Sequence, residues 1–215
     1  MSLQSINNSG FGALAPAAPA AGRRERKLQD TKSHIGDVAW GLFDAHGYEN
    51  VTMETIAEAA DVAKGTLYKH YQAKESLIQH RIDQICLERQ ESITAAVIAM
   101  PTSVKRFEYL FREIEPYLES MRSYVFPYLL FMCSPNNGSR APTIFDTSLV
   151  ELLRLGQLTG DIVTDMPAER MAEYLTFLRL VSLMRWVQDP ESNLREVTSE
   201  MLSLFLNGVA RKAQL

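Results

Sequence analysis

Residues 52–74, TMETIAEAADVAKGTLYKHYQAK, predict two short helices joined by a tight turn. Thr52 precedes the first apolar run, and its hydroxyl can cap a helix over residues 52–60. Small and apolar side chains then recur every three to four positions, which gives this helix one inner face. The pattern breaks at Asp61. A second helix follows over residues 63–70, with its apolar side turned inward.

The outer face of the second helix carries the residue types that a helix needs in the major groove of DNA. Cations bind phosphate, and side chains that hydrogen-bond can reach base edges. Gly65, near the helix start, lets a backbone come close to phosphate, where the helix dipole also favours an anion. Composition alone fits equally well with a solvated face of a small helical bundle. The candidate DNA-binding residues are Thr52, Lys64, Gly65, Thr66, Tyr68, Lys69, His70 and Lys74.

Two adjoining stretches, AWGLFDAHGYENVTMETIA at residues 39–57 and AEAADVAKGTLYKHYQAKESL at residues 57–77, resemble the DNA-binding region of the TetR family of bacterial transcriptional regulators. The resemblance covers residues 31–77. It implies an all-α fold with an N-terminal three-helix helix-turn-helix DNA-binding domain. It also implies a C-terminal helical domain that binds an effector and forms a dimer.

Two positions depart from the family pattern. Asp61 stands where the family usually has Gly in the turn, and Asp tolerates a left-handed backbone better than most residues. Ala63 replaces the usual Ser that caps the second helix, a local loss of about 0.5–2 kcal/mol. We therefore expect an intact but somewhat strained turn.

The 215-residue chain has a formal net charge of −4, which is unexpected for a protein that binds DNA. Residues 23–82 contain nine Lys and Arg and nine Asp and Glu, so the excess negative charge lies after residue 82. Nonspecific affinity for DNA should therefore be modest and strongly salt-dependent. No apolar run approaches the length that spans a bilayer, so we expect no membrane partner.

The sequence offers little for catalysis or metal binding. Cys86 and Cys133 are isolated, which indicates reduced thiols and a cytoplasmic location. There is no glycine-rich phosphate loop, nucleophile elbow, HExxH or EF-hand pattern, and the histidines have no ligand spacing. We predict no enzyme activity, no cofactor and no metal. An enzyme built on the C-terminal domain would need an acid, base or nucleophile that we cannot identify.

Composition divides the chain into three parts. Residues 1–26 form an Ala- and Pro-rich tail that we expect to be disordered and to end in a basic arm. Residues 27–76 form the DNA-binding domain, with its motif at 52–71, and residues 77–215 form the effector-binding and dimerisation domain. The basic run at 23–27 is either a flexible arm for phosphate or the minor groove, or a solvated helix start.

Helical periodicity predicts further helices outside the motif. One begins at Thr31 and ends with a left-handed cap at Gly47. Another, over residues 75–99, links the two domains and ends before a proline. Asp165 should cap a later helix that has Pro167 in its first turn. The remaining predicted helices cover residues 104–118, 121–133, 142–160, 165–187 and 194–209, with a loop at 134–139.

Aromatic and Met residues are dense in the C-terminal domain. Such residues at helical spacing usually fill a core, but they also suit a mainly apolar ligand cavity. The resemblance implies that an effector in such a cavity shifts the long linking helix and spoils the fit of two recognition helices to DNA. The composition favours an apolar or aromatic effector. The candidate lining residues are Tyr109, Tyr128, Phe131, Met132, Cys133 and Phe177.

The last two predicted helices each carry an apolar stripe. The resemblance implies that they form a four-helix dimer interface, and packing within one protomer is the alternative. A two-fold dimer places two recognition helices about 34–36 Å apart and therefore reads palindromes. The candidate interface residues are Met171, Tyr174, Leu178, Val181, Met201, Leu204, Phe205 and Val209.

These features together predict a homodimeric, ligand-responsive transcriptional regulator. We expect a repressor that a small apolar or aromatic effector releases from a palindromic double-stranded DNA operator. The alternative is a DNA-binding protein of the same fold without a small-molecule effector, controlled by a protein partner or by its own concentration.

Overall fold

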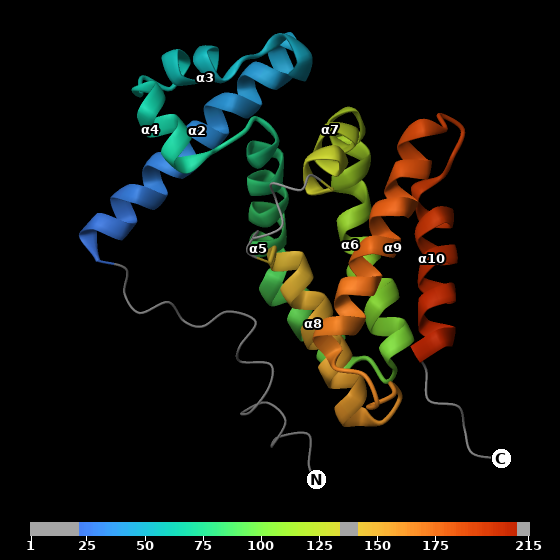
Figure 1. Ribbon diagram of the computed structural model, residues 1–215. Coiled ribbons are helices and arrows are strands. Elements are labelled where there is room, and N and C mark those ends of the chain that lie inside the picture. Colours follow the sequence, from blue (N-terminus) through green and yellow to red (C-terminus); the bar gives the residue numbers. More distant parts are fainter. Residues whose placement is uncertain (1–21, 134–141, 210–215) are drawn as a thin grey trace, which may run out of the picture. The chain divides into compact units, whose positions relative to one another are not determined.

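The computed structural model describes residues 22–133 and 142–209, which form α-helices and one 3₁₀ turn (Figure 1). The predicted all-α fold is therefore confirmed. The chain divides into two compact units between Gln84 and Ile85. This point lies further along the linking helix than the boundary expected at residues 76–77.

The first unit contains the helix-turn-helix. It is built from α2 (Arg23–His46), η2 (Tyr48–Asn50), α3 (Met53–Ala59), α4 (Lys64–His70) and the first turns of α5 (Glu75–Ala99). Apolar side chains from every one of these elements meet in one core, which explains how two helices of seven residues each stay ordered. The core residues include Ile35, Ala39, Phe43, Tyr48, Ile56, Leu67, Tyr71 and Leu77.

Helix α2 begins at Arg23, well before the predicted start at Thr31. The backbone N–H of Gly22 donates to the Glu25 carboxylate over 3.1 Å, and the basic residues that follow are exposed. The basic run is thus a solvated helix start in this structure. The disordered tail expected upstream lies outside the described residues.

Local signals set most of the turns around the motif. The Thr52 hydroxyl accepts a hydrogen bond from the Thr55 N–H at 3.1 Å and caps α3, as predicted. Asp61 has φ 51°, the left-handed turn conformation expected of it. Ala63 is the N-cap of α4 and provides no side-chain hydrogen bond. Gly47 is the C-cap of α2 with the positive φ of 79° expected, but its ψ of 146° lies outside the left-handed helical region, so its position was predicted correctly and its conformation was not.

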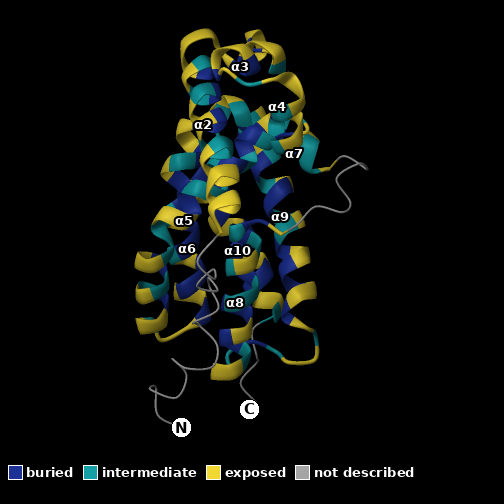
Figure 2. Cartoon of the chain, turned by 90° about the vertical axis from the view of Figure 1, so that its left-hand side faces the viewer, coloured by how far each residue is buried: buried dark blue, intermediate teal, exposed yellow. Residues whose placement is uncertain are grey.

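The second unit is a bundle of α6 (Ser103–Ser120), α7 (Arg122–Met132), α8 (Ile144–Thr159), α9 (Ala168–Gln188) and α10 (Leu194–Val209), with the rest of α5. Helix α9 packs against α7, α8 and α10, and α10 also packs against α6 (Figure 1). Figure 2 shows buried residues on the inner faces of these helices and exposed residues outside. The loop predicted at 134–139 lies outside the described residues.

The bundle helices end close to where the sequence predicts. Gly160 terminates α8 in the left-handed conformation, with φ 83° and ψ 10°. Thr143 and Asp146 form a capping box at its start. The cap predicted at Asp165 was wrong, because α9 begins later and has Pro167 as its N-cap, outside the helix. Over the described ranges, no helix combines the length and the apolar composition needed to cross a membrane.

Candidate DNA-binding site and effector cavity

Packing on its inner side holds the recognition helix α4 in place. Leu67 is completely buried, and Tyr71, directly after the helix, is nearly so. The Tyr71 hydroxyl donates to the Lys32 carbonyl oxygen of α2 over 2.9 Å. Burial raises the pKa of the Tyr71 phenol, with a smaller contribution from Asp37, so the phenol stays protonated and keeps donating this bond.

The outer side of α4 is open. Lys64, Gly65, Tyr68 and Lys69 are exposed, and an added Cβ at Gly65 would meet nothing within 4 Å. Tyr68 keeps 44% of its surface accessible although it is a large aromatic residue. A phosphate or a base edge can therefore approach the helix along this side.

Thr66 and His70 are half-buried at the margins of the open face. Burial lowers the pKa of the His70 imidazole, and the nearby charges of Lys69 and Lys32 lower it further. The lowered pKa favours the neutral imidazole, whose ring can both donate and accept hydrogen bonds.

Lys64 and Thr52 already have partners within the unit. The Lys64 ammonium lies 3.7 Å from the Glu54 carboxylate, and both side chains are more than half exposed. An exposed pair of this kind is weak. Thr52 is exposed at the start of α3, where its hydroxyl also lies 3.0 Å from the hydroxyl of Thr55.

Lys74 differs most from the expected surface cation. Its ammonium donates to the carbonyl oxygens of Tyr48 at 2.7 Å and Val51 at 3.0 Å. It also lies 3.9 Å from the centre of the Tyr48 ring. These contacts tie the turn after α2 to the start of α5. The ammonium would have to leave both carbonyls to reach a phosphate.

In the second unit, a cavity of about 20 Å³ lies against α5. Space of this size holds about one water molecule, so a ligand could enter only if side chains moved. Half of the lining comes from α5, and sequence reasoning missed these residues because they were assigned to a linking helix alone. The lining residues are Cys86, Gln90, Ile93, Thr94 and Val97 of α5, Leu110 and Ile114 of α6, and Phe145, Ser148 and Leu152 of α8.

The six predicted ligand-binding residues do not line this cavity, and the structure does not bring them together. Tyr128 is buried, Phe131 is half-buried and Cys133 is exposed. The Arg112 guanidinium lies over the Tyr109 ring, with its central carbon 5.3 Å from the ring centre. Only Met132 and Phe177 share a site, an open depression of about 470 Å³ beside α8 and α9. Helix α7, which carries the aromatic run, packs mainly on α9.

The predicted dimer residues separate into three groups by burial. Met171, Met201 and Phe205 are buried within the protomer, so the intramolecular alternative holds for them. Leu178 and Val209 are half-buried. A helical stripe shows only which residues are apolar, and it does not show which of them the protomer itself covers. The residues left more than half exposed are Tyr174, Val181 and Leu204, together with Phe177 on α9.

No group of three or more His, Cys, Asp or Glu side chains in the described part of the chain is placed to hold a metal ion.

A helix-turn-helix with an open recognition helix, followed by a helical bundle, defines a DNA-binding transcriptional regulator. Residues 35–80 match the family described as bacterial regulatory proteins, tetR family. The match covers the second half of α2, all of α3 and α4 and the start of α5, and relatives that align along most of the chain are regulators. The first unit is therefore similar to the DNA-binding domain of TetR-family regulators, and the chain is similar along most of its length to a solved TetR-family repressor.

Two full-length relatives are transcriptional regulators. MftR of Mycobacterium tuberculosis is 24% identical over 210 residues, which cover 91% of this chain and 100% of MftR. AcrR of Shigella flexneri is 29% identical over 207 residues, which cover 86% of this chain and 92% of AcrR.

Solved structures of similar fold include two transcriptional regulators named FadR. FadR of Thermus thermophilus, a TetR-family repressor in complex with lauroyl-CoA, gives a TM-score of 0.73 at 25% identity. That similarity covers 86% of this chain and 98% of FadR. FadR of Bacillus subtilis in complex with stearoyl-CoA gives a TM-score of 0.58 at 17% identity, over 82% of this chain and 98% of that one, and shows the fold alone.

Proposed function

We propose that the protein is a homodimeric repressor that releases a palindromic operator when an apolar effector enters the cavity against α5. One observation carries the proposal: α5 supplies half of the cavity lining and also packs into the DNA-binding unit. Leu77 and Ile78, in the first turn of α5, are buried in that unit. An effector that displaces α5 therefore acts on the helix that supports α3 and α4.

For operator binding, α4 enters the major groove from its exposed side. Lys64 and Lys69 neutralise phosphates, and Gly65 lets the backbone at the helix start approach the sugar-phosphate chain. Tyr68, and Thr66 and His70 at the margins, are the groups nearest to base edges. Lys74 acts mainly inside the protein, through the two carbonyls that it binds.

For the effector, an elongated apolar molecule suits both the lining and the relatives. The similar FadR structure of Thermus thermophilus holds an acyl-CoA thioester, lauroyl-CoA. The cavity lining is largely apolar, with Gln90, Thr94 and Ser148 as polar exceptions. Because the cavity is small, the effector must open it, and that requirement couples binding to movement of α5.

Tyr68→Ala tests operator binding. We expect the substitution to weaken binding to a palindrome selected from random duplex DNA by about tenfold to a hundredfold, the loss of roughly 1–3 kcal/mol of base discrimination. Fluorescence anisotropy at fixed salt measures the affinity. Tyr109→Ala, which removes a tyrosine from the bundle, should bind like wild type. Equal affinities for Tyr68→Ala and wild type would exclude Tyr68 from the interface.

Thr94→Phe tests the cavity. The larger ring should fill the space against α5 and cost about 1–3 kcal/mol of stability. We expect a twelve-carbon apolar ligand, tested both as dodecanoate and as lauroyl-CoA, to release wild type from the selected operator and to leave Thr94→Phe bound. Ile98→Phe, which adds the same ring at an exposed position one turn on, is the control. If Thr94→Phe is released as readily as Ile98→Phe, the effector binds elsewhere.

The small size of the cavity also favours an alternative, a regulator of the same fold that responds to a protein partner and binds no small molecule. A ligand that binds the native state raises the unfolding midpoint. An apolar ligand panel that leaves the midpoint of the dimer unchanged would select this alternative.

A further inference from the structure

Arg179 of α9 is a buried cation with an unmet hydrogen-bonding capacity. It is 7% exposed, and its Nε atom has no hydrogen-bond partner among the described residues. Its guanidinium lies 4.6 Å from the centre of the Phe145 ring. A cation–π contact offsets only part of the free energy lost when a charge leaves water.

Arg106 shows how a buried arginine looks when its role is structural. It is 4% exposed, and its guanidinium donates to the Val97 carbonyl at 3.2 Å and the Met100 carbonyl at 2.9 Å. A third donor reaches the Thr159 hydroxyl at 3.4 Å. Arg106 thus joins the end of α5 to α6 and α8. Arg179 forms no comparable set of bonds.

Arg179 lines a second cavity of about 20 Å³, which borders the cavity against α5. Ile114 and Phe145 belong to the lining of both, so these two side chains form the wall between them. The Phe145 ring meets the edge of Phe111 with a centroid distance of 5.3 Å. A turn of the Phe145 ring would join the two spaces.

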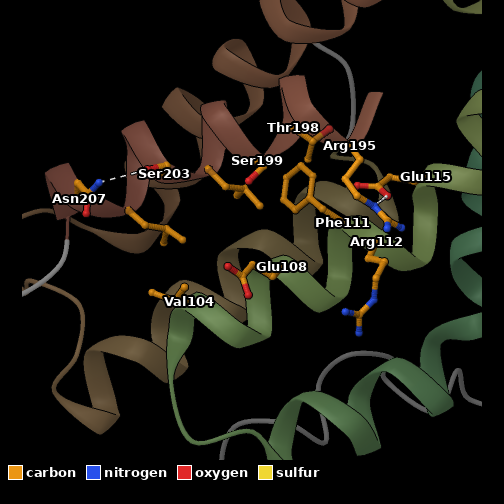
Figure 3. Close-up of a pocket in the computed structure, with 12 residues that line it drawn as sticks. Val104, Glu108, Phe111, Arg112, Glu115, Arg195, Thr198, Ser199, Ser203 and Asn207 are labelled. Carbon is orange, nitrogen blue, oxygen red and sulfur yellow. Dashed lines mark hydrogen bonds and ion pairs between the residues drawn. The ribbon is translucent and has the colours of Figure 1, made fainter. Parts of the chain in front are cut away.

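The Arg179 cavity also borders the surface. Phe111, Glu115 and Thr198 line both this cavity and an open groove of about 460 Å³ between α6 and α10 (Figure 3). Figure 3 shows Phe111 in the groove, near the ion pair of Glu115 with Arg195. The groove, the Arg179 cavity and the cavity against α5 are therefore neighbours in series, with Phe111 shared by the first two and Phe145 by the last two.

We propose that Arg179 is the anion-binding residue of the effector site, and that the effector is an apolar carboxylic acid. The carboxylate pairs with the Arg179 guanidinium, and the apolar chain lies in the cavity against α5. This inference rests on the proposed function and names the effector class of the same site.

The surroundings of Arg179 select a compact single anion. The nearest acid in the cavity lining is Glu115, and its carboxylate already accepts a hydrogen bond from the Arg195 Nε at 3.1 Å. The hydroxyls of Ser182 and Thr198 in the same lining can complete the hydrogen bonds of a carboxylate. The remaining lining is apolar, so a bulky polyanionic headgroup does not fit beside Arg179.

The test compares ligands of one chain length on the full-length dimer without DNA. Dodecanoate carries the carboxylate, dodecanol lacks it, and lauroyl-CoA carries a thioester and distant phosphates. Isothermal titration calorimetry measures affinity, and differential scanning fluorimetry measures the unfolding midpoint. For wild type, we expect dodecanoate to bind at least tenfold tighter than dodecanol.

Three variants assign the preference to one side chain. Arg179→Met should bind dodecanoate and dodecanol equally, and its ligand-free midpoint should equal or exceed that of wild type, because an unpaired buried charge has gone. Arg179→Lys should keep part of the preference. Arg185→Met, at an exposed arginine of the same helix, should behave as wild type.

Several results would overturn the inference. Equal binding of dodecanoate and dodecanol to wild type would do so, and this comparison does not depend on how any variant folds. A lower ligand-free midpoint for Arg179→Met, or failure of that variant to fold, would assign Arg179 a structural role. Binding of lauroyl-CoA alone would exclude a free carboxylate. In each case, operator binding that depends on Tyr68 would leave the proposed function intact.

Discussion

At the scale of single residues, His80 stands out because it is buried without a partner for one ring nitrogen. It is 7% exposed, and its Nε2 has no hydrogen-bond partner among the described residues. The Tyr71 ring packs edge-on against it at 5.6 Å. A Cβ at position 36 would lie 3.0 Å from its Cδ2 atom, which explains why Gly36 is there.

His80 predicts an acid-sensitive fold. Burial, followed by the charge of Lys32, lowers its pKa to about 4, although Asp37 opposes the shift. The unfolded chain binds a proton near pH 6.5, so the stabilising effect is complete above that value and is lost as the pH falls towards 4. At about 1.4 kcal/mol per pKa unit, the loss is roughly 3 kcal/mol.

Urea unfolding between pH 7 and pH 4.5 measures this effect. His80→Leu should lose less stability over the interval than wild type, because the substituted residue cannot be protonated. His46→Gln, at an exposed histidine, should follow wild type. Parallel pH curves for wild type and His80→Leu would contradict the prediction.

Single residues also show how far sequence reasoning reaches. The Thr52 cap and the left-handed Asp61 depend on neighbours within four positions, and the sequence predicted both. The partners of Lys74 lie 23 and 26 residues away, and the sequence did not reveal them. The ring beside Arg179 belongs to a different helix. Contacts between residues so far apart in the chain depend on tertiary packing, which cannot be derived from one sequence alone.

At the scale of elements, α4 lacks one of its natural supports. Its N-cap, Ala63, has the extended backbone of a cap, with φ −63° and ψ 143°, but no side chain that accepts a hydrogen bond. Burial of Leu67 and Tyr71 compensates for the missing side-chain cap. The same helix must present its outer side to DNA, so its order bears directly on affinity.

Ala63→Ser should therefore stabilise the protein by about 0.5–2 kcal/mol. Chemical unfolding of the dimer measures the change. Ala95→Ser places the same residue on an exposed face inside α5, where Ser is a weaker helix former than Ala, and should lower stability slightly. Equal losses in the two variants would show that position 63 does not act as a cap.

Both ends of the long helix α5, residues 75 and 99, were predicted from the sequence. Its contribution to the cavity lining was not predicted. Periodicity identifies a helix from its apolar positions, and Pro101 marks its end. The cavity that α5 lines depends on which side chains of α6 and α8 leave space beside it. A cavity between packed helices cannot be predicted from the local sequence pattern of any one of them.

At the scale of the whole molecule, α9 and α10 keep apolar side chains in water. Tyr174, Phe177 and Val181 are spaced at one to two turns along α9, and Leu204 is exposed on α10. A row of large apolar side chains on one helix is typical of an interaction surface. We infer that these residues, without the buried Met171, Met201 and Phe205, form the dimer contact.

Val181→Lys should break that dimer, because the contact would bury an unpaired charge. Analytical ultracentrifugation should show a monomer, and affinity for the palindrome should fall because the two half-sites no longer bind together. Leu158→Lys, at an exposed leucine of α8, should leave the dimer intact. A dimeric Val181→Lys protein would place the interface elsewhere.

The ion pair of Lys64 with Glu54 affects how the dimer samples chromosomal DNA. The carboxylate is a counterion built into the protein, so Lys64 exchanges one anion for another when it meets a phosphate. Fewer bound ions are then released per contact, which flattens the dependence of random-site affinity on ionic strength. On DNA whose phosphates do not lie near Lys64, the Lys64 ammonium stays paired with the Glu54 carboxylate. If Lys64 contacts phosphate as proposed, we expect the protein to dissociate readily from random sequence and to remain longest where a phosphate is placed to compete with Glu54 for Lys64.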